Sequence, residues 1–299
     1  MVFDYFTSSD KVSIRYGIWD CGAKTKKGSV ILLGGRKEFM EKYAETIEEL
    51  KQRQFDVYSM DWRGQGLSAR ILANRQKGYI SNYSEYLEDL NYFVNNIVRP
   101  AAVSPIIILG HSMGGHVALR FLHDFPEAAD KAVLTSPMID INIPTFPRWL
   151  VRFIAFCASG AGFGHSYSVG SKGYSVSNIK FEGNILTSDP VRFMDEHRAI
   201  AESPELALGG VTYGWLAATF RSIDILSGAE YAGKIKTPVL IISAGKDRIV
   251  SEAAQRDICS VMGKGSFVSI PDSFHEILKE RDAVRKTFWK EFDKFASES

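Results

Sequence analysis

The sequence predicts an α/β fold in which a mostly parallel central sheet is flanked by helices. Short apolar runs alternate along the chain with longer segments whose apolar residues recur at helical spacing, a pattern typical of parallel strands joined by helices. One apolar run, residues 106–109, leads through a glycine-rich turn directly into a helical segment at residues 113–125. The length of 299 residues, 45% of them hydrophobic, allows one large domain or a core domain that carries an insertion.

The expected strands are of two kinds. In residues 11–20, Val12, Ile14, Tyr16 and Ile18 occupy alternate positions, which indicates a strand with these side chains on one face. The remaining expected strands are continuous apolar runs, which are typical of parallel strands buried on both faces. They are residues 30–33, 57–60, 106–109, 132–134, 239–242 and 267–270.

The expected helices lie between these strands and follow the 3.6-residue period of their apolar side chains. In the last of them, Val284, Phe288, Phe292 and Phe295 lie on one face. We therefore expect this helix to pack its aromatic face against the sheet. The expected helices are residues 40–53, 84–98, 113–125, 251–262 and 281–296.

The alternation stops between residues 140 and 232, where the chain is rich in aromatic residues and loops and contains no convincing strand. We expect residues 140–232 to form a helical lid, inserted after the sixth core strand and lying over the carboxyl edge of the sheet. Residues 1–139 and 233–299 would then form the core. The alternative is that residues 140–232 extend the core itself.

The hexapeptide Gly110-His111-Ser112-Met113-Gly114-Gly115 has the pattern G-x-S-x-G between an expected strand and an expected helix. This context is that of a nucleophile elbow, which exposes a serine hydroxyl at the carboxyl edge of the sheet. Small residues are needed on both sides of the serine because bulky side chains would collide across the turn. The alternative is a chance match in a glycine-containing turn, but Ser112 is the expected nucleophile.

A serine hydroxyl needs a base to remove its proton and an acid to orient that base. Asp247 follows the expected strand 239–242, and His275 follows the expected strand 267–270. The order Ser, Asp, His is the one that accompanies a nucleophile elbow. We therefore expect His275 as the base and Asp247 as the acid, with Asp272 and Asp224 as weaker candidates for the acid.

Two backbone amides are expected to stabilise the oxyanion that forms during acyl transfer. One is the N–H of Met113, directly after the nucleophile. The other is the N–H of Arg36, in the loop Gly34-Gly35-Arg36-Lys37-Glu38 that follows the expected strand 30–33. The alternative is that the two glycines only form a turn. The segment Asp61–Gly66 is expected to brace neighbouring loops rather than to take part in chemistry.

In these residues the chain resembles the α/β-hydrolase superfamily, and more narrowly the lysophospholipase L2 and monoacylglycerol lipase group of serine hydrolases. The resemblance implies an α/β-hydrolase fold and an oxyanion hole formed by Arg36 and Met113. Gly34-Gly35 stands where monoacylglycerol lipases usually carry His-Gly, which favours the lysophospholipase branch. The matching segments are the elbow, Gly35–Glu45, Asp61–Ser68 and, within the expected lid, Asn184–Phe193 and Gly209–Trp215.

The composition argues against several other classes of protein. The 36 basic and 35 acidic residues are well mixed, so no nucleic-acid partner is expected. Cys21, Cys157 and Cys259 are too few and too widely spaced for a disulfide framework or a metal cluster. Residues 1–5 do not resemble a secretory signal, and no apolar run reaches the ~18 residues that span a bilayer. We expect a cytoplasmic protein without metal or cofactor, and the oligomeric state stays open.

The expected function is the hydrolysis of carboxylic esters of single-acyl-chain lipids, either a lysophospholipid or a monoacylglycerol. Residues 149–156 could make transient contact with a membrane surface, although packing within the lid is the favoured interpretation. One alternative to a lipid-ester hydrolase is a carboxylesterase or a prolyl-type aminopeptidase, and another is a non-catalytic ligand-binding protein. An aminopeptidase would need acidic residues in the lid to hold the amine of its substrate. The candidates are Glu182, Asp195, Glu196, Glu202 and Glu205.

Overall fold

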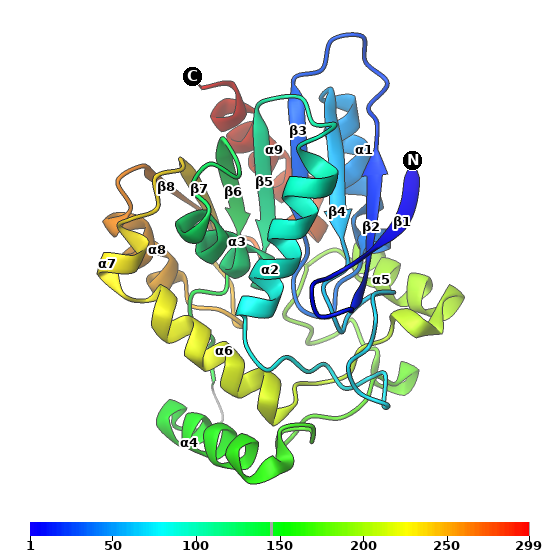
Figure 1. The fold of residues 1–299 in the computed structure, drawn as a ribbon, viewed down its shortest axis with the longest axis vertical. Coiled ribbons are helices and arrows are strands. Elements are labelled where there is room, and N and C mark those ends of the chain that lie inside the picture. The colour runs from blue at the N-terminus through cyan, green and yellow to red at the C-terminus, as the bar shows by residue number, and fades with distance from the viewer. Residues whose placement is uncertain (144–145, 299) are drawn as a thin grey trace.

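The computed structural model describes residues 1–143 and 146–298, which form an eight-stranded sheet flanked by helices (Figure 1). The strand order is β1-β2-β4-β3-β5-β6-β7-β8. β1 and β2 are antiparallel to their neighbours, and the other strands run parallel. The predicted α/β fold with a mostly parallel sheet is confirmed. The strands are β1 (Val2–Thr7), β2 (Ser13–Trp19), β3 (Gly28–Leu33), β4 (Phe55–Met60), β5 (Ile106–His111), β6 (Lys131–Thr135), β7 (Val239–Ala244) and β8 (Gly265–Ile270).

The edge strand β1 is not among the strands predicted from the sequence. It pairs with β2 from Val2 opposite Ile18 to Thr7 opposite Ser13. Phe6 is its one buried residue, so it carries neither an apolar run nor a clear alternation. Its strand conformation depends on hydrogen bonds to β2, a long-range pairing that local pattern does not reveal.

Each predicted helix of the core is present. The helices are η1 (Met40–Tyr43) with α1 (Ala44–Gln52), α2 (Ser84–Phe93) with η2 (Val94–Val98), α3 (Met113–Asp124), α8 (Glu252–Val261) and α9 (Asp282–Ser297). The predicted aromatic face of α9 is buried, including Phe288 and Phe292.

The helices cover both faces of the sheet, and successive residues of the inner strands alternate between two cores on these opposite faces. Ile108 packs in the core that contains the apolar residues of α2 and α3, whereas Leu109 packs in the core of α1 and α9.

After β6, the sixth strand, residues 140–232 contain helices and, in the described part of this range, no strand. Residues 144 and 145 lie outside the described residues. Figure 1 shows α4, α5 and α6 gathered beyond one end of the sheet, with α4 lying alongside α6. Among the described residues, no helix combines the length and apolarity that a membrane span requires. The elements are α4 (Arg148–Ala158), η3 (Ser159–Phe163), η4 (Val176–Asn178), α5 (Pro190–Glu202), η5 (Pro204–Leu206), α6 (Tyr213–Leu226) and α7 (Ala229–Ala232).

Two buried polar contacts attach α6 to the core. The Tyr83 hydroxyl lies 3.0 Å from Thr219 Oγ1. His116 Nδ1 donates to the carbonyl of Met138 at 2.8 Å, and its Nε2 accepts from the Ser222 hydroxyl at 2.6 Å. Because one ring nitrogen donates and the other accepts, this geometry holds His116 neutral. Burial lowers the pKa of His116 to about 3.

This burial predicts a loss of stability in acid. Between pH 6.5 and about 3, the His116 side chain is protonated in the unfolded chain but not in the folded one, so the free energy of unfolding falls as the pH falls. Replacing His116 with Gln should reduce this slope by as much as about 1.4 kcal/mol per pH unit near pH 5. Urea denaturation at several pH values measures this dependence of the free energy of unfolding on pH.

Ser222→Ala is the matched control, because it removes the hydroxyl partner and leaves the titrating ring in place. This variant should be less stable at every pH, with the slope retained. A His116→Gln protein with the slope of the unchanged protein would contradict the assignment.

Candidate active site

Ser112 occupies a sharp turn between β5 and α3. Its φ of 50° lies in the left-handed region, which non-glycine residues adopt only at a cost of about 1–3 kcal/mol. The neighbouring glycines make the turn sterically possible. A Cβ atom on Gly114 would lie 2.4 Å from the carbonyl oxygen of Leu33, and one on Gly110 would lie 3.0 Å from the Cα of Gly115. The strand–serine–helix arrangement expected from the sequence is therefore present.

The structure brings Ser112, His275 and Asp247 together in one hydrogen-bonded chain. The Ser112 Oγ lies 3.0 Å from His275 Nε2, and His275 Nδ1 lies 2.7 Å from Asp247 Oδ2. All three residues come from loops that follow parallel strands, namely β5, β7 and β8. With the proton on Nδ1, the imidazole donates to the carboxylate, and its free Nε2 can accept the proton of the serine hydroxyl.

The surroundings of Asp247 keep its carboxylate ionised. Burial raises the pKa of Asp247, but the hydrogen bond to His275 and the backbone amides outweigh burial and bring that pKa below its usual value. The amides of Ile249 and Val250 donate to Asp247 Oδ1 at 2.8 and 3.0 Å. One carboxylate oxygen is thus fixed by the backbone, which leaves the other to orient the imidazole.

The weaker acid candidates lie elsewhere. Asp272 is paired with Lys246 at the surface, at 2.8 Å. Asp224 is paired with Arg152 of α4, at 2.6 Å. Neither carboxylate is a hydrogen-bond partner of His275 within the described residues.

The loop after β3 lies directly beside the serine. A Cβ on Gly35 would come within 3.2 Å of the Ser112 Cβ, so this backbone approaches the nucleophile as closely as a glycine allows. In the described part of the chain, the backbone amides of Arg36 and Met113 have no hydrogen-bond acceptor. Two free amides next to a serine hydroxyl are the donors that an oxyanion site requires.

The guanidinium of Arg36 holds a loop of residues 140–232 rather than standing free. Its Nη2 donates to the carbonyls of Gly209 and Gly210 at 3.0 and 2.7 Å. It also stacks over the ring of Trp215, with 4.9 Å from Cζ to the ring centroid. Burial lowers the pKa of Arg36 to about 10. The side chain thus joins the loop after β3 to the segment that precedes α6.

A buried charge cluster that was not predicted from the sequence supports the same loop. Lys42 Nζ lies 2.9 Å from Glu38, 2.8 Å from Glu196 and 2.7 Å from Glu276. Glu38 also accepts hydrogen bonds from the Gly35 amide and the Tyr43 hydroxyl. Burial raises the pKa of Glu38, but Lys42 and the other donors lower it to about 2. In the sequence, only the spacing of four residues between Glu38 and Lys42 indicates that these two side chains could pair.

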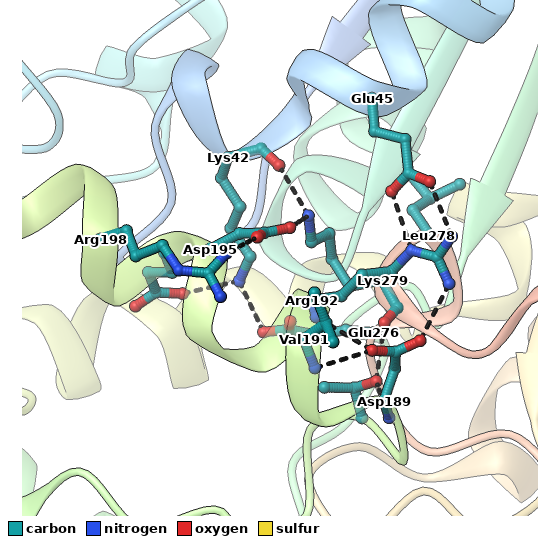
Figure 2. A network of polar contacts seen from close by, with 12 residues as sticks. Lys42, Glu45, Asp189, Val191, Arg192, Asp195, Arg198, Glu276, Leu278 and Lys279 are labelled. Atoms are coloured by element: carbon teal, nitrogen blue, oxygen red, sulfur yellow. Dashed lines mark hydrogen bonds and ion pairs between the residues drawn. The ribbon is translucent and has the colours of Figure 1, made fainter.

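Figure 2 shows how further ion pairs fix α5 to the core beside this cluster. Arg192 donates to both carboxylate oxygens of Glu45, at 2.8 and 2.7 Å. Asp195, which lies on α5 together with Arg192, is 2.9 Å from Lys279 Nζ. These contacts place α5 against α1 and the short helix η6 (Ile277–Lys279), next to the loop that carries His275.

The acidic residues considered for an amine site are either paired or exposed. Asp195 faces Lys279, and Glu196 faces Lys42. Glu182, Glu202 and Glu205 are exposed. The two carboxylates that lie near the site therefore already have cationic partners.

One group of potential metal ligands exists in the described residues, formed by Asp20, Cys21 and Asp56. Lys26 Nζ already lies 2.6 Å from Asp56 and 3.3 Å from Asp20. A lysine ammonium at this position supplies the positive charge that the carboxylates need, so the group fits an ion pair better than a metal site.

Residues 24–282 match the family described as Serine aminopeptidase, S33. Lysophospholipase L2 of Escherichia coli strain K12 is 32% identical over 94% of this chain and 83% of its own length. The monoacylglycerol lipase of Mycolicibacterium smegmatis is 23% identical over 92% of this chain and 90% of its own length.

Among solved structures, a soluble variant of the Saccharomyces cerevisiae monoglyceride lipase, in complex with a substrate analog, superposes with a TM-score of 0.78. It is 18% identical in sequence and is matched over 98% of this chain and 94% of its own. This likeness establishes the α/β-hydrolase fold.

The hydrogen-bonded chain predicts different effects for Asp247, which contacts His275, and for Asp272, which is close to His275 only in the sequence. Asp247→Asn should lower kcat by about 10³-fold or more, because an amide favours the wrong imidazole tautomer and cannot stabilise an imidazolium. KM should change little, since Asp247 does not face the substrate. Hydrolysis of a short chromogenic ester measures both constants. Asp272→Asn is the matched control and should leave kcat unchanged, so equal losses in the two variants would contradict the assignment.

Proposed function

The chain belongs to the serine aminopeptidase S33 family and is an ester hydrolase, and we propose that it cleaves single-acyl-chain lipids, either lysophospholipids or monoacylglycerols. The observation that carries this proposal is the hydrogen-bonded chain Ser112–His275–Asp247. The likeness to lysophospholipase L2 over 94% of the chain supports a lipid ester as the substrate.

In the first step, Ser112 Oγ attacks the acyl carbonyl carbon while His275 Nε2 accepts the hydroxyl proton. Asp247 stabilises the resulting imidazolium. The oxyanion lies against the amides of Arg36 and Met113, and each such donor is worth about 3–4 kcal/mol in related acyl-transfer sites. When the tetrahedral intermediate collapses, His275 gives its proton to the departing glycerol oxygen, and the acyl group stays on Ser112.

In the second step, water releases the fatty acid. His275 takes a proton from the water as its oxygen attacks the acyl-enzyme, and the same two amides bind the second oxyanion. His275 then returns the proton to Ser112 Oγ as the carboxylic acid leaves. The residues of this chain thus supply the nucleophile, the base and the oxyanion donors.

Residues 140–232 would act as the lid, with residues 1–139 and 233–299 as the core. Support comes from the contacts of Arg36 with Gly209 and Gly210, which tie this segment to the loop beside Ser112. The aromatic residues of the segment suit an acyl chain, since each buried CH₂ contributes about 0.8 kcal/mol.

The outer face of α4 would touch the membrane or micelle that holds the substrate. Trp149 is 69% exposed and Phe153 is 60% exposed, one helical turn apart on the same face. The helix itself is held in place, because Ala155 packs against α6 and Arg152 pairs with Asp224 of α6. Exposed aromatic residues on a packed helix are typical of a surface that meets lipid.

This contact predicts weaker binding to lipid when both aromatic side chains are removed. Trp149→Ser combined with Phe153→Ser should reduce partition into lipid vesicles by about tenfold or more. Turnover of a water-soluble short ester should stay unchanged. Co-sedimentation with vesicles measures the partition. Val261→Ser, at an exposed site on α8, is the control, and an equal loss in that variant would refute a specific role for α4.

The main alternative is an aminopeptidase, which the description of the family favours. Such an enzyme needs a free carboxylate for the amine of its substrate, but Asp195 and Glu196 are paired with Lys279 and Lys42. A non-catalytic binding protein would have no use for the hydrogen-bonded chain at Ser112.

Fatty-acid release tests the proposal directly. A lysophospholipid and a monoacylglycerol with the same acyl chain are compared, with Ser112→Ala as the blank and an amino-acyl amide as the competing substrate. We expect release from at least one lipid, lost in the Ser112→Ala variant. Turnover of the amide without release from either lipid would overturn the proposal in favour of the aminopeptidase.

A further inference from the structure

A cavity of about 240 Å³ lies between the loop after β3, the segment after His275 and residues of the proposed lid. Its wall includes Glu276, the residue after His275, and Lys37, the residue after Arg36. Gly209 and Gly210 form another part of the wall, where their carbonyls hold the Arg36 guanidinium. The cavity is therefore bounded by residues that neighbour, in sequence, His275 and Arg36 of the candidate site.

The charges around this cavity fall into two sets. Lys42 is paired with Glu196 and Glu276, the two carboxylates of the wall, and Arg192 is paired with Glu45. Lys37, Lys172 and Lys180 also line the cavity, and in the described residues none of them forms an ion pair. Lys172 has only a long contact of 3.4 Å with the amide oxygen of Asn178. The cavity thus retains unneutralised positive charge.

Lys37 is the most constrained of these lysines. Its φ of 69° lies in the left-handed region, and its backbone amide donates to Gln65 Oε1 at 2.6 Å, so the loop fixes its place. The side chain is half-buried. Burial lowers the pKa of Lys37, and the charges of Glu196 and Glu276 offset this effect only in part. An anion bound in the cavity would stabilise the charged form of Lys37.

From this placement we propose that the cavity binds the phosphate of a lysophospholipid head group, with Lys37 as the principal contact. The inference rests on the proposed lipid-ester function and selects the substrate within it. A phosphodiester can accept hydrogen bonds from several ammonium groups at once. An uncharged glycerol head group would leave the same lysines unpaired, so the cavity discriminates between the two classes of lipid.

Substrate selectivity in charge variants of Lys37 tests the proposal. The value of kcat/KM is measured for a lysophosphatidylethanolamine and a monoacylglycerol with the same acyl chain, in the same neutral detergent micelle. Lys37→Gln should lower the lysophospholipid value about tenfold, mainly through KM. The monoacylglycerol value should fall much less. Lys37→Arg should retain the preference, and Lys290→Gln, on the exposed face of α9, should behave as the unchanged protein.

Three results would overturn the proposal, and they have different meanings. Equal losses on the two lipids would give Lys37 a role in loop structure alone. Inhibition of monoacylglycerol hydrolysis by inorganic phosphate, with the lipid preference unaffected in Lys37→Gln, would make the cavity a site for free phosphate. Release from neither lipid by the unchanged protein would instead reject the proposed function on which the inference depends.

Discussion

The turn at Ser112 is the constraint on which the rest of the site depends. β5 must reverse into α3 within one residue, so Ser112 adopts a φ of 50° and Gly114 touches the carbonyl of Leu33. That contact fixes the end of β3 relative to the nucleophile and brings Gly35 against Ser112. The relative positions of the hydroxyl and the backbone amides are therefore set by steric contact between main chains rather than by flexible side chains.

The buried ion pairs around Lys42 position the loops that main-chain contact does not fix. Glu38 fixes the amide of Gly35, and Lys42 joins Glu38 to Glu196 of α5 and to Glu276 beside His275. Removing one partner from such a buried cluster costs about 3–5 kcal/mol, because it leaves an uncompensated charge. The cluster thereby couples the loop after β3, the histidine loop and α5. The lysines left outside it give the neighbouring cavity its positive charge.

The sequence predicted the inner strands, the core helices and the meeting of Ser112, Asp247 and His275, because continuous apolar runs and strand ends are local signals. It did not predict β1, whose exposed residues are ordered by pairing with β2. Nor did it identify the partners of Lys42, since Glu196 and Glu276 are brought to it only by the folded chain. The roles assigned to the site residues and to the lid stay predictions.

Covalent labelling is the most direct test of the central claim, that Ser112 is a nucleophile activated by His275 and Asp247. The protein is treated with a fluorophosphonate that carries an acyl-like chain, and the modified peptide is identified by mass spectrometry. We expect a single adduct on Ser112, with slower labelling in a His275→Ala variant. An adduct at another residue, or labelling that does not depend on His275, would contradict it.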